Sequence, residues 1–284
     1  MQKVLILGAK GNLGEQLKII FSDENYEVIA WDRDDFDVID KELVFEKIKK
    51  VKPNFIINSA AYNAVDRCEE SEEEFELAKK INGLAPGYLA EVAKDISAIF
   101  IHYSTDYIFG GQQREGYQEN DIPSPINKYG ESKLLGEELI QEKAKDYYII
   151  RTSKLFGPKG KSELTKPSFF DIMIKLSQDK DKLDVVDEEL SCFTYTPDLA
   201  KATKELLESK QEYGIYHLVN EGQVTWYEAV KELFKILNKD IKINPVSSDK
   251  FPRPARRPKY SALLNTKFVQ LRNYREALVD YLNT

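Results

Sequence analysis

The chain has 284 residues, of which 42% are hydrophobic and 31% are charged, and its formal net charge is −7 at pH 7. This composition is typical of a globular protein. It argues against a disordered chain, a membrane protein and a nucleic-acid-binding protein, since the chain has neither a long apolar run nor an overall basic charge.

The N-terminal segment has a short apolar core that runs directly into glycines, so it is interpreted as a β-strand and not as a signal peptide. A cytoplasmic location is the default expectation. Cys68 and Cys192 have the spacing of neither a disulfide framework nor a metal site, so no metal is expected. Further short apolar runs alternate with amphipathic segments of helical spacing, and they lie at 27–31, 55–61, 98–104, 147–152, 183–186 and 215–219. This alternation predicts an α/β fold with a doubly wound parallel sheet.

The first strand is followed by a glycine-rich turn and then by an apolar-periodic helix. Glycines in such a turn let the backbone approach a pyrophosphate, whose charge is stabilised by the free N–H groups of the helix N-terminus. The second strand ends in Asp32, which is suited to the ribose hydroxyls of NAD, and Arg33 beside it is suited to the 2′-phosphate of NADP. The cofactor is therefore predicted to be NADPH or NADH. The predicted contacts are Gly8, Lys10, Gly11, Asn12, Leu13, Gly14, Asp32 and Arg33, with Asp37 and Val38 on the next loop near the adenine.

Tyr129 and Lys133 lie one helical turn apart in a segment that follows several prolines, so both side chains are expected on one face of a helix. A phenol with a pKa of about 10 is a poor acid at neutral pH, but a nearby ammonium and an oxidised nicotinamide ring both favour the phenolate. The pair is thus suited to moving a proton. Exposed helices often carry such a pair by chance, and it is the glycine-rich turn upstream that favours the catalytic interpretation.

After residue 154 the pattern loosens into a loop rich in Gly, Pro, Ser and Lys, with helices expected around 168–179, 197–209 and 226–238. The strands near 183–186 and 215–219 are expected to extend the first sheet. Residues 1–153 and roughly 182–219 are therefore predicted to form a Rossmann domain for the dinucleotide. Residues 154–181 and 220–284 are predicted to form a smaller α/β lobe for the substrate, interleaved with the first domain in sequence.

Several segments together carry a resemblance to a known family. They are GAKGNLG at 8–14, YSTDYIFGG at 103–111, PSPINKYGESKLLGE at 123–137 and ARRPKYSAL at 255–263. The chain resembles the extended short-chain dehydrogenases/reductases, and within them the dTDP-4-dehydrorhamnose reductases. This resemblance implies NAD(P)H-dependent reduction of a nucleotide-linked 4-keto-6-deoxy sugar, giving dTDP-L-rhamnose or a close relative. It implies a nucleotide-sugar substrate as the partner and leaves a homodimer open.

The resemblance also implies roles for individual residues. Tyr129 would donate a proton to the substrate O4, and Lys133 would bind the nicotinamide ribose and lower the pKa of the tyrosine. Thr105 would orient the carbonyl. The remaining implied contacts are Asp106 to the sugar hydroxyls, and Ala60, Ala61 and Tyr62 to the central portion of the cofactor.

Two of the positions that depart from the family pattern change the charge. Lys154 stands where the family has a tryptophan that packs on the sugar, and Glu189 stands where it has a glutamine. Either the two residues pair with each other in a rebuilt pocket, or Lys154 contacts a polar substituent of a different sugar. In the basic segment 253–259, Arg257 or Arg256 is predicted to bind the diphosphate of the substrate, with a solubilising loop as the alternative.

Two other functions remain open. A sugar-nucleotide epimerase or dehydratase would recycle a tightly held NAD, but a dehydratase needs a glutamate where this chain has Tyr107, after Thr105 and Asp106. A non-catalytic, reductase-like regulatory subunit is disfavoured by the presence of both Tyr129 and Lys133.

Overall fold

The computed structural model describes residues 1–163 and 165–283. Its centre is a six-stranded sheet in the order β10-β5-β4-β3-β1-β2, in which every pairing is parallel. The strands are β1 (Gln2–Leu7), β2 (Tyr26–Trp31), β3 (Phe55–Asn58), β4 (Ile99–Thr105), β5 (Tyr147–Thr152) and β10 (Gly214–His217). The predicted doubly wound Rossmann sheet is confirmed, with β10 paired to β5 as the apolar run at 215–219 indicated.

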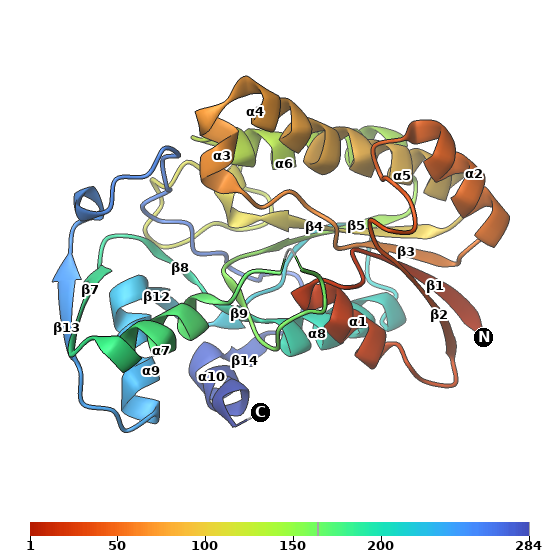
Figure 1. Ribbon diagram of the computed structural model, residues 1–284. Helices are drawn as coiled ribbons and strands as arrows, with labels where there is room; N and C mark the ends of the chain where they lie inside the picture. The colour runs from red at the N-terminus through yellow and green to blue at the C-terminus, as the bar shows by residue number, and fades with distance from the viewer. Residues whose placement is uncertain (164, 284) are drawn as a thin grey trace.

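Helices cover both faces of this sheet (Figure 1). One face carries α2 (Lys41–Val51), α5 (Ala85–Asp95) and α6 (Lys128–Lys143), with α3 (Val65–Glu70) and α4 (Glu72–Ala78) beside them. The other face carries α1 (Asn12–Ile20) and α8 (Thr196–Glu208). Because side chains alternate along a strand, Val4 and Ile6 pack into the core under α1 and α8, whereas Leu5 and Leu7 pack into the core under α2 and α5.

A smaller lobe lies at the carboxyl edge of the sheet (Figure 1). Its helices are α7 (Phe169–Asp179), α9 (Trp226–Ile236) and α10 (Tyr274–Leu282). Its strands are β6 (Leu155–Phe156), β7 (Lys182–Val186), β8 (Leu190–Cys192), β9 (Thr194–Tyr195), β11 (Asn220–Glu221), β12 (Gln223–Thr225), β13 (Lys242–Val246) and β14 (Leu271–Asn273). Among the described residues, no helix is both long and apolar enough to cross a membrane.

One strand prediction is wrong. β7 pairs in parallel with β13 and does not extend the central sheet. Leu183 and Val185 of β7 pack in a third core with Phe170 and Phe193, which belong to the smaller lobe. A short apolar run is equally suited to either sheet, and the residues that decide lie far away in sequence. The proposed domain boundaries stay a prediction.

A segment between β13 and β14 of the smaller lobe returns to the large lobe. Tyr117 and Leu263 form a parallel bridge, flanked by hydrogen bonds from Tyr117 N to Ala262 O (2.8 Å) and from Leu264 N to Tyr117 O (2.8 Å). Thr266 donates from its hydroxyl to the buried carboxylate of Glu119 at 2.6 Å. We call residues 255–266 the returning segment. It joins the two lobes beside the carboxyl edge of the sheet.

Candidate active site

The strands of the central sheet end together at one edge. β1 leads there into the glycine-rich turn, β3 into Ala60, β4 into Asp106 and β5 into Lys154. In open parallel sheets this carboxyl edge is where ligands bind. All the predicted site residues except Arg257 and the Tyr129–Lys133 pair come from these strand ends, from the loops that follow them or from the first turn of α1.

The glycines of the turn are required by close backbone approaches. Gly8 has a φ of +72°, and a Cβ there would lie 2.7 Å from the backbone nitrogen of Ala60. A Cβ on Gly14 would lie 2.2 Å from the carbonyl oxygen of Gly8. Gly11 is the N-cap of α1 and supplies no side-chain cap, so the first N–H groups of the helix are left for a ligand or water. These features fit the pyrophosphate of a dinucleotide.

A second loop packs directly on this turn. Gly160 N donates to Asn12 Oδ1 at 2.7 Å, and Ser162 N donates to the carbonyl of Lys10 at 2.9 Å. A Cβ on Gly160 would lie 2.5 Å from the carbonyl carbon of Gly11. Gly160 is therefore a glycine for the same reason as Gly8. Nothing in the sequence pattern singled it out.

The residues predicted to bind adenosine lie around the end of β2. The Asp32 carboxylate accepts from Lys10 N at 2.9 Å and from Arg33 N at 2.8 Å, which fixes it beside the glycine-rich turn. Arg33 and Asp37 are exposed, and Val38 packs partly against the core beside α2. The side chain of Lys10 forms an ion pair with Asp34. Because Asp32 is fixed in position and Arg33 beside it is exposed, this end of the site is compatible with both NADH and NADPH.

Tyr129, Thr105 and Asp106 converge, as the sequence predicted. The Tyr129 hydroxyl lies 3.4 Å from Asn63 Oδ1, and the Thr105 hydroxyl donates to Asp106 Oδ1 at 3.2 Å. Burial raises the pKa of Tyr129 above its ordinary value, and a hydrogen bond with Thr105 acts in the opposite direction. Burial also raises the pKa of Asp106, opposed first by a hydrogen bond from Ser261 of the returning segment at 2.6 Å.

Lys133 lies one turn after Tyr129 on α6, but its amine is directed elsewhere. Nζ lies 2.6 Å from the carbonyl oxygen of Tyr103 and 3.2 Å from His102 Nε2. Burial lowers the pKa of Lys133 to about 8, while Glu137 raises it. The effect of Lys133 on the pKa of Tyr129 stays a prediction.

Two asparagines complete the surroundings of Tyr129 and were not singled out from the sequence. Asn82 lies in a π-helical turn, Lys79–Leu84, where its side chain bonds both backbone groups of Tyr62 and donates to Ser132 Oγ at 3.0 Å. It thereby ties the loop after β3 to α6. Asn63 is exposed and is the partner of the Tyr129 hydroxyl. Both lie in segments that resemble the family, Asn63 in NSAAYNAVDRCE at 58–69 and Asn82 in Ile-Asn at 81–82, but neither residue was given a role from the sequence.

Lys154 occupies an unusual position. Its backbone has a φ of +39°, and its Nζ is buried with no hydrogen-bond partner in the described part of the chain. The amine lies over the ring of Trp226, 3.6 Å from the centroid. Burial lowers the pKa of Lys154 to about 8, while Asp106 and Glu189 raise it.

The predicted alternative of a Lys154–Glu189 pair is wrong. Glu189 forms an ion pair with Arg253 and accepts from Trp226 Nε1 at 2.9 Å. Its oxygens are therefore occupied by groups that the sequence pattern did not place nearby. The other predicted explanation, a contact between Lys154 and the substrate, stays a prediction.

Arg257 is held by another carboxylate. Its two terminal nitrogens donate to Asp66 of α3 at 2.7 and 2.8 Å, and Nη1 also donates to the carbonyl of Ala255. The guanidinium lowers the pKa of Asp66. Arg257 thus fastens the returning segment to the large lobe, with part of its donors already used.

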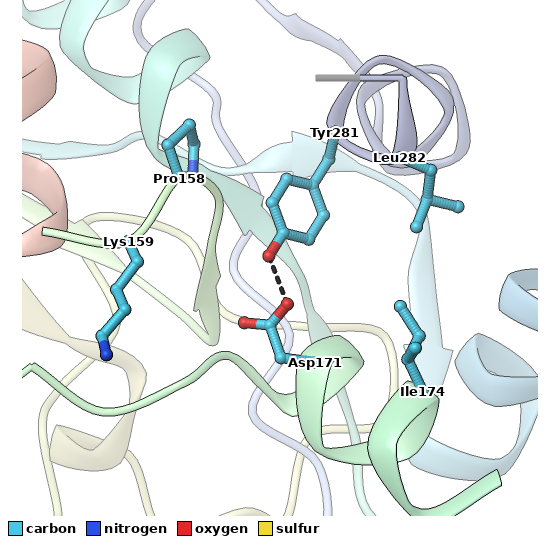
Figure 2. Close-up of a pocket in the computed structure, with 6 residues that line it drawn as sticks. All are labelled: Pro158, Lys159, Asp171, Ile174, Tyr281 and Leu282. Atoms are coloured by element: carbon cyan, nitrogen blue, oxygen red, sulfur yellow. Dashed lines mark hydrogen bonds between the residues drawn. The ribbon is translucent and has the colours of Figure 1, made fainter. Parts of the chain in front are cut away.

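A cavity of about 390 Å³ opens elsewhere on the molecule, lined by Pro158, Lys159, Asp171, Ile174, Tyr281 and Leu282 (Figure 2). Figure 2 shows Tyr281 of α10 bonded to Asp171 of α7 across it. Its lining comes from the loop that carries Gly160 and from the smaller lobe, and it includes none of the predicted site residues.

The family model described as RmlD substrate binding domain matches residues 1–284. The chain belongs to the RmlD substrate binding domain family. One relative is the spore coat polysaccharide biosynthesis protein SpsK of Bacillus subtilis (strain 168), which is 36% identical over 99% of this chain and 97% of its own length. Another is the dTDP-4-dehydrorhamnose reductase of Aggregatibacter actinomycetemcomitans, 36% identical over 95% of this chain and 93% of its own.

Solved structures agree with membership of the RmlD family. A dTDP-4-dehydrorhamnose reductase from Clostridium acetobutylicum matches with a TM-score of 0.92 at 36% identity, covering 99% of each chain. The dTDP-4-dehydrorhamnose reductase of Bacillus anthracis, solved in complex with NADP, matches with a TM-score of 0.93 at 33% identity, covering 100% of this chain and 99% of that one. The family named from the sequence motifs is therefore confirmed.

Proposed function

We propose that this protein is a reductase that uses NADPH or NADH to convert the 4-keto group of a nucleotide-linked 4-keto-6-deoxy sugar, such as dTDP-4-dehydrorhamnose, into a hydroxyl. The observation that carries the proposal is the convergence of Tyr129, Thr105 and Asp106 beside an uncapped, glycine-rich helix N-terminus. The relatives named as dTDP-4-dehydrorhamnose reductases support the sugar and the reaction.

The residues of the carboxyl edge fit a dinucleotide. The close approaches at Gly8 and Gly14 leave backbone N–H groups of α1 unshielded by side chains, and Asp32 is fixed beside them by Lys10 N. Gly8, Lys10, Gly11, Asn12, Leu13 and Gly14 would hold the pyrophosphate, and Asp32 and Arg33 would hold the adenosine ribose. When bound, the reduced nicotinamide supplies the hydride.

The chain's own residues supply orientation and the proton. Tyr129 donates its phenolic proton to the developing alkoxide at C4. Thr105 turns its hydroxyl proton from Asp106 to the same oxygen and holds the carbonyl in place. The burial that raises the pKa of Tyr129 keeps the phenol protonated until the substrate needs that proton. Lys133 binds the nicotinamide ribose in this proposal, which requires Nζ to leave the Tyr103 carbonyl.

The sugar end of the site favours a neutral hydroxyl between Lys154 and Asp106. The two charges affect each other's pKa, yet Lys154 Nζ has no hydrogen-bond partner in the described residues. A hydroxyl can accept from the ammonium and donate to the carboxylate, whereas a substrate carboxylate would be repelled by Asp106 and a substrate ammonium by Lys154.

The experiment for the sugar end uses deoxy analogues of the keto-sugar nucleotide, assayed with wild type and with Lys154→Met. For one of the analogues, the loss of its sugar hydroxyl should lower kcat/KM about tenfold in the wild type. The same loss should have little further effect in Lys154→Met, because the missing hydroxyl and the missing amine belong to one contact. Purely additive losses at every position would contradict this contact.

The main test is Tyr129→Phe, which removes only the proton donor. We expect kcat to fall by about 10²–10⁴-fold while the Kd of NADPH changes little. Tyr216→Phe is the matched control, since Tyr216 is a buried tyrosine of β10 whose hydroxyl bonds the Glu212 carbonyl away from the site. A Tyr129→Phe enzyme that keeps more than half of the wild-type kcat would remove Tyr129 from the reaction.

The same assay separates the alternatives. A reductase consumes added NAD(P)H in proportion to keto-sugar nucleotide. An epimerase keeps its cofactor through purification and consumes none, and a regulatory subunit shows neither behaviour. Either of the last two outcomes would overturn the proposed function.

A further inference from the structure

Three buried polar side chains form a chain from β3 through β4 to α6. Asn58 Nδ2 lies 3.1 Å from His102 Nδ1, and His102 Nε2 lies 3.2 Å from Lys133 Nζ. All three residues are almost completely shielded from solvent, with 2%, 0% and 2% of their surfaces exposed. One of the two hydrogen-bond partners of the buried His102 ring is therefore the lysine of the candidate active site.

The orientation of the Asn58 amide is fixed by its other partner. Asn58 Oδ1 accepts a hydrogen bond from Ala60 N at 3.1 Å. The opposite orientation of the amide would set two donors, the Asn58 NH₂ and the Ala60 N–H, against each other. The NH₂ group therefore faces the histidine and donates to Nδ1.

The tautomer of His102 then determines the protonation state of Lys133. A neutral imidazole has one donor nitrogen and one acceptor nitrogen, so Nδ1, which accepts from Asn58, leaves the ring proton on Nε2. That N–H is directed at Lys133 Nζ. An ammonium has three donors and no acceptor, and only a neutral amine has the lone pair that can receive this hydrogen.

We propose that His102 is a positioning residue that donates its Nε2 proton to Lys133 and thereby holds Lys133 as a neutral amine while Nζ rests beneath the active site. In this state one N–H of the amine donates to the Tyr103 carbonyl at 2.6 Å, and a second N–H is left over. Lys133 takes up its third proton from water when it leaves His102.

The surroundings agree with this assignment. Burial lowers the pKa of His102 well below 6.5, so the ring does not become a cation that would donate from both nitrogens. Burial also lowers the pKa of Lys133. The charged group that opposes this is Glu137 on α6, and it is engaged in a buried ion pair with Arg151 of β5 at 2.7 Å. Tyr129 on the same helix has a raised pKa and is uncharged near neutral pH.

The consequence is a lysine whose charge depends on its position. Bound to His102 it is neutral and does not assist ionisation of Tyr129. Moved to a cofactor ribose, it is freed from the Nε2 donor, becomes an ammonium and favours the phenolate. This inference rests on the proposed function only in the role given to Lys133 once cofactor is bound.

The direct test is the tautomer of His102 in the cofactor-free protein, read from the ¹⁵N shifts of the imidazole nitrogens. The chain has only two histidines, and a His217→Gln variant leaves His102 as the single signal. We expect the proton on Nε2 between pH 6 and 8, and we expect Lys133 to be a neutral amine across that range, because the Nε2 donor adds to the lowering of its pKa by burial. A ring proton on Nδ1, or a Lys133 that is an ammonium at pH 7, overturns the inference.

Two variants test the cause. In Asn58→Asp the new carboxylate can only accept a hydrogen bond, so it favours the tautomer with the ring proton on Nδ1. Nε2 then carries the lone pair and can accept a hydrogen bond from an ammonium. We expect the Lys133 titration to rise by at least about 1 pH unit. In His102→Gln the amide oxygen can likewise accept, and the same rise is expected.

His217→Gln is the control for both variants, because His217 is also buried but bonds Leu264 and Arg151 and not Lys133. An unchanged Lys133 titration in the His102→Gln and Asn58→Asp variants contradicts the inference even if both are folded and active. These measurements use no turnover, so their failure is distinct from failure of the Tyr129→Phe test.

Discussion

Replacing Lys154 by methionine should stabilise the protein at pH 7. In the folded state the pKa of Lys154 is lowered from 10.5 to about 8, mainly by burial. At pH 7 the lysine is protonated in both the folded and the unfolded chain, so folding buries the charge. A shift of this size corresponds to a cost of about 3 kcal/mol in the free energy of unfolding.

Part of that cost is offset by the ring beneath the amine. A desolvated cation over a tryptophan contributes about 2 kcal/mol, and Lys154 Nζ lies 3.6 Å from the Trp226 centroid. The net cost of the buried lysine is therefore about 1 kcal/mol. Methionine has a similar length, carries no charge and makes a favourable sulfur contact with an aromatic ring. Lys154→Met should raise the free energy of unfolding by about 1–2 kcal/mol at pH 7.

The sign of the pH dependence follows from the lowered pKa. The cost is fully present below about pH 8, because the lysine is charged in both states. It falls as the pH rises from about 8 to 10.5, because the folded protein loses this proton before the unfolded chain does. The advantage of the methionine variant should therefore shrink between pH 7 and pH 10.

The assay is urea unfolding of wild type and variant at pH 7, 8.5 and 10, with Lys235→Met as the control. The Lys235 side chain is 78% exposed, and its substitution should change the free energy of unfolding by less than about 0.5 kcal/mol at each pH. A methionine variant that is less stable than wild type at pH 7, or a difference that does not change with pH, would refute the reasoning.

Three further substitutions test the nucleotide and returning-segment contacts. Arg33→Ala should raise the KM for NADPH more than that for NADH, and equal effects on both would mean that Arg33 does not contact the 2′-phosphate. Gly160→Ala places a methyl group 2.5 Å from the backbone of the glycine-rich turn, so the Kd of NADPH should rise about tenfold or more, and an unchanged Kd would show that the loop moves freely. Asp66→Asn removes the charge opposite Arg257 and should lower the free energy of unfolding by about 1–2 kcal/mol in urea titrations without raising the KM for the nucleotide sugar. A raised KM would assign Asp66 itself to the substrate site.

The parts of the fold and site that the sequence predicted are those set by local pattern. Continuous apolar runs predict buried parallel strands, and glycines between a strand and a helix predict the turn that Gly8 and Gly14 make. Tyr129 and Lys133 are one turn apart on α6 because helical spacing requires it. The convergence of Thr105 with Tyr129 followed from the family motifs.

What the sequence did not predict depends on contacts between distant segments. The sheet that β7 joins is decided by β13, and the partner of Glu189 is decided by Arg253, just before the returning segment. The direction of the Lys133 amine depends on His102, which lies on another element of the fold. An apolar or charged residue has several acceptable partners, and only the packed structure selects one.

The returning segment also determines when folding can finish. Asp106 and Glu119 are buried carboxylates, and they receive hydrogen bonds from Ser261 and Thr266 near the end of the chain. During synthesis the large sheet emerges from the ribosome long before these partners, so an N-terminal fragment has buried acceptors left without donors. Pairing across such a sequence separation also slows folding. We therefore expect the nascent chain to become protease-resistant only after its release, although the last strand of the sheet has formed by then. We also expect the two lobes to melt in one cooperative transition.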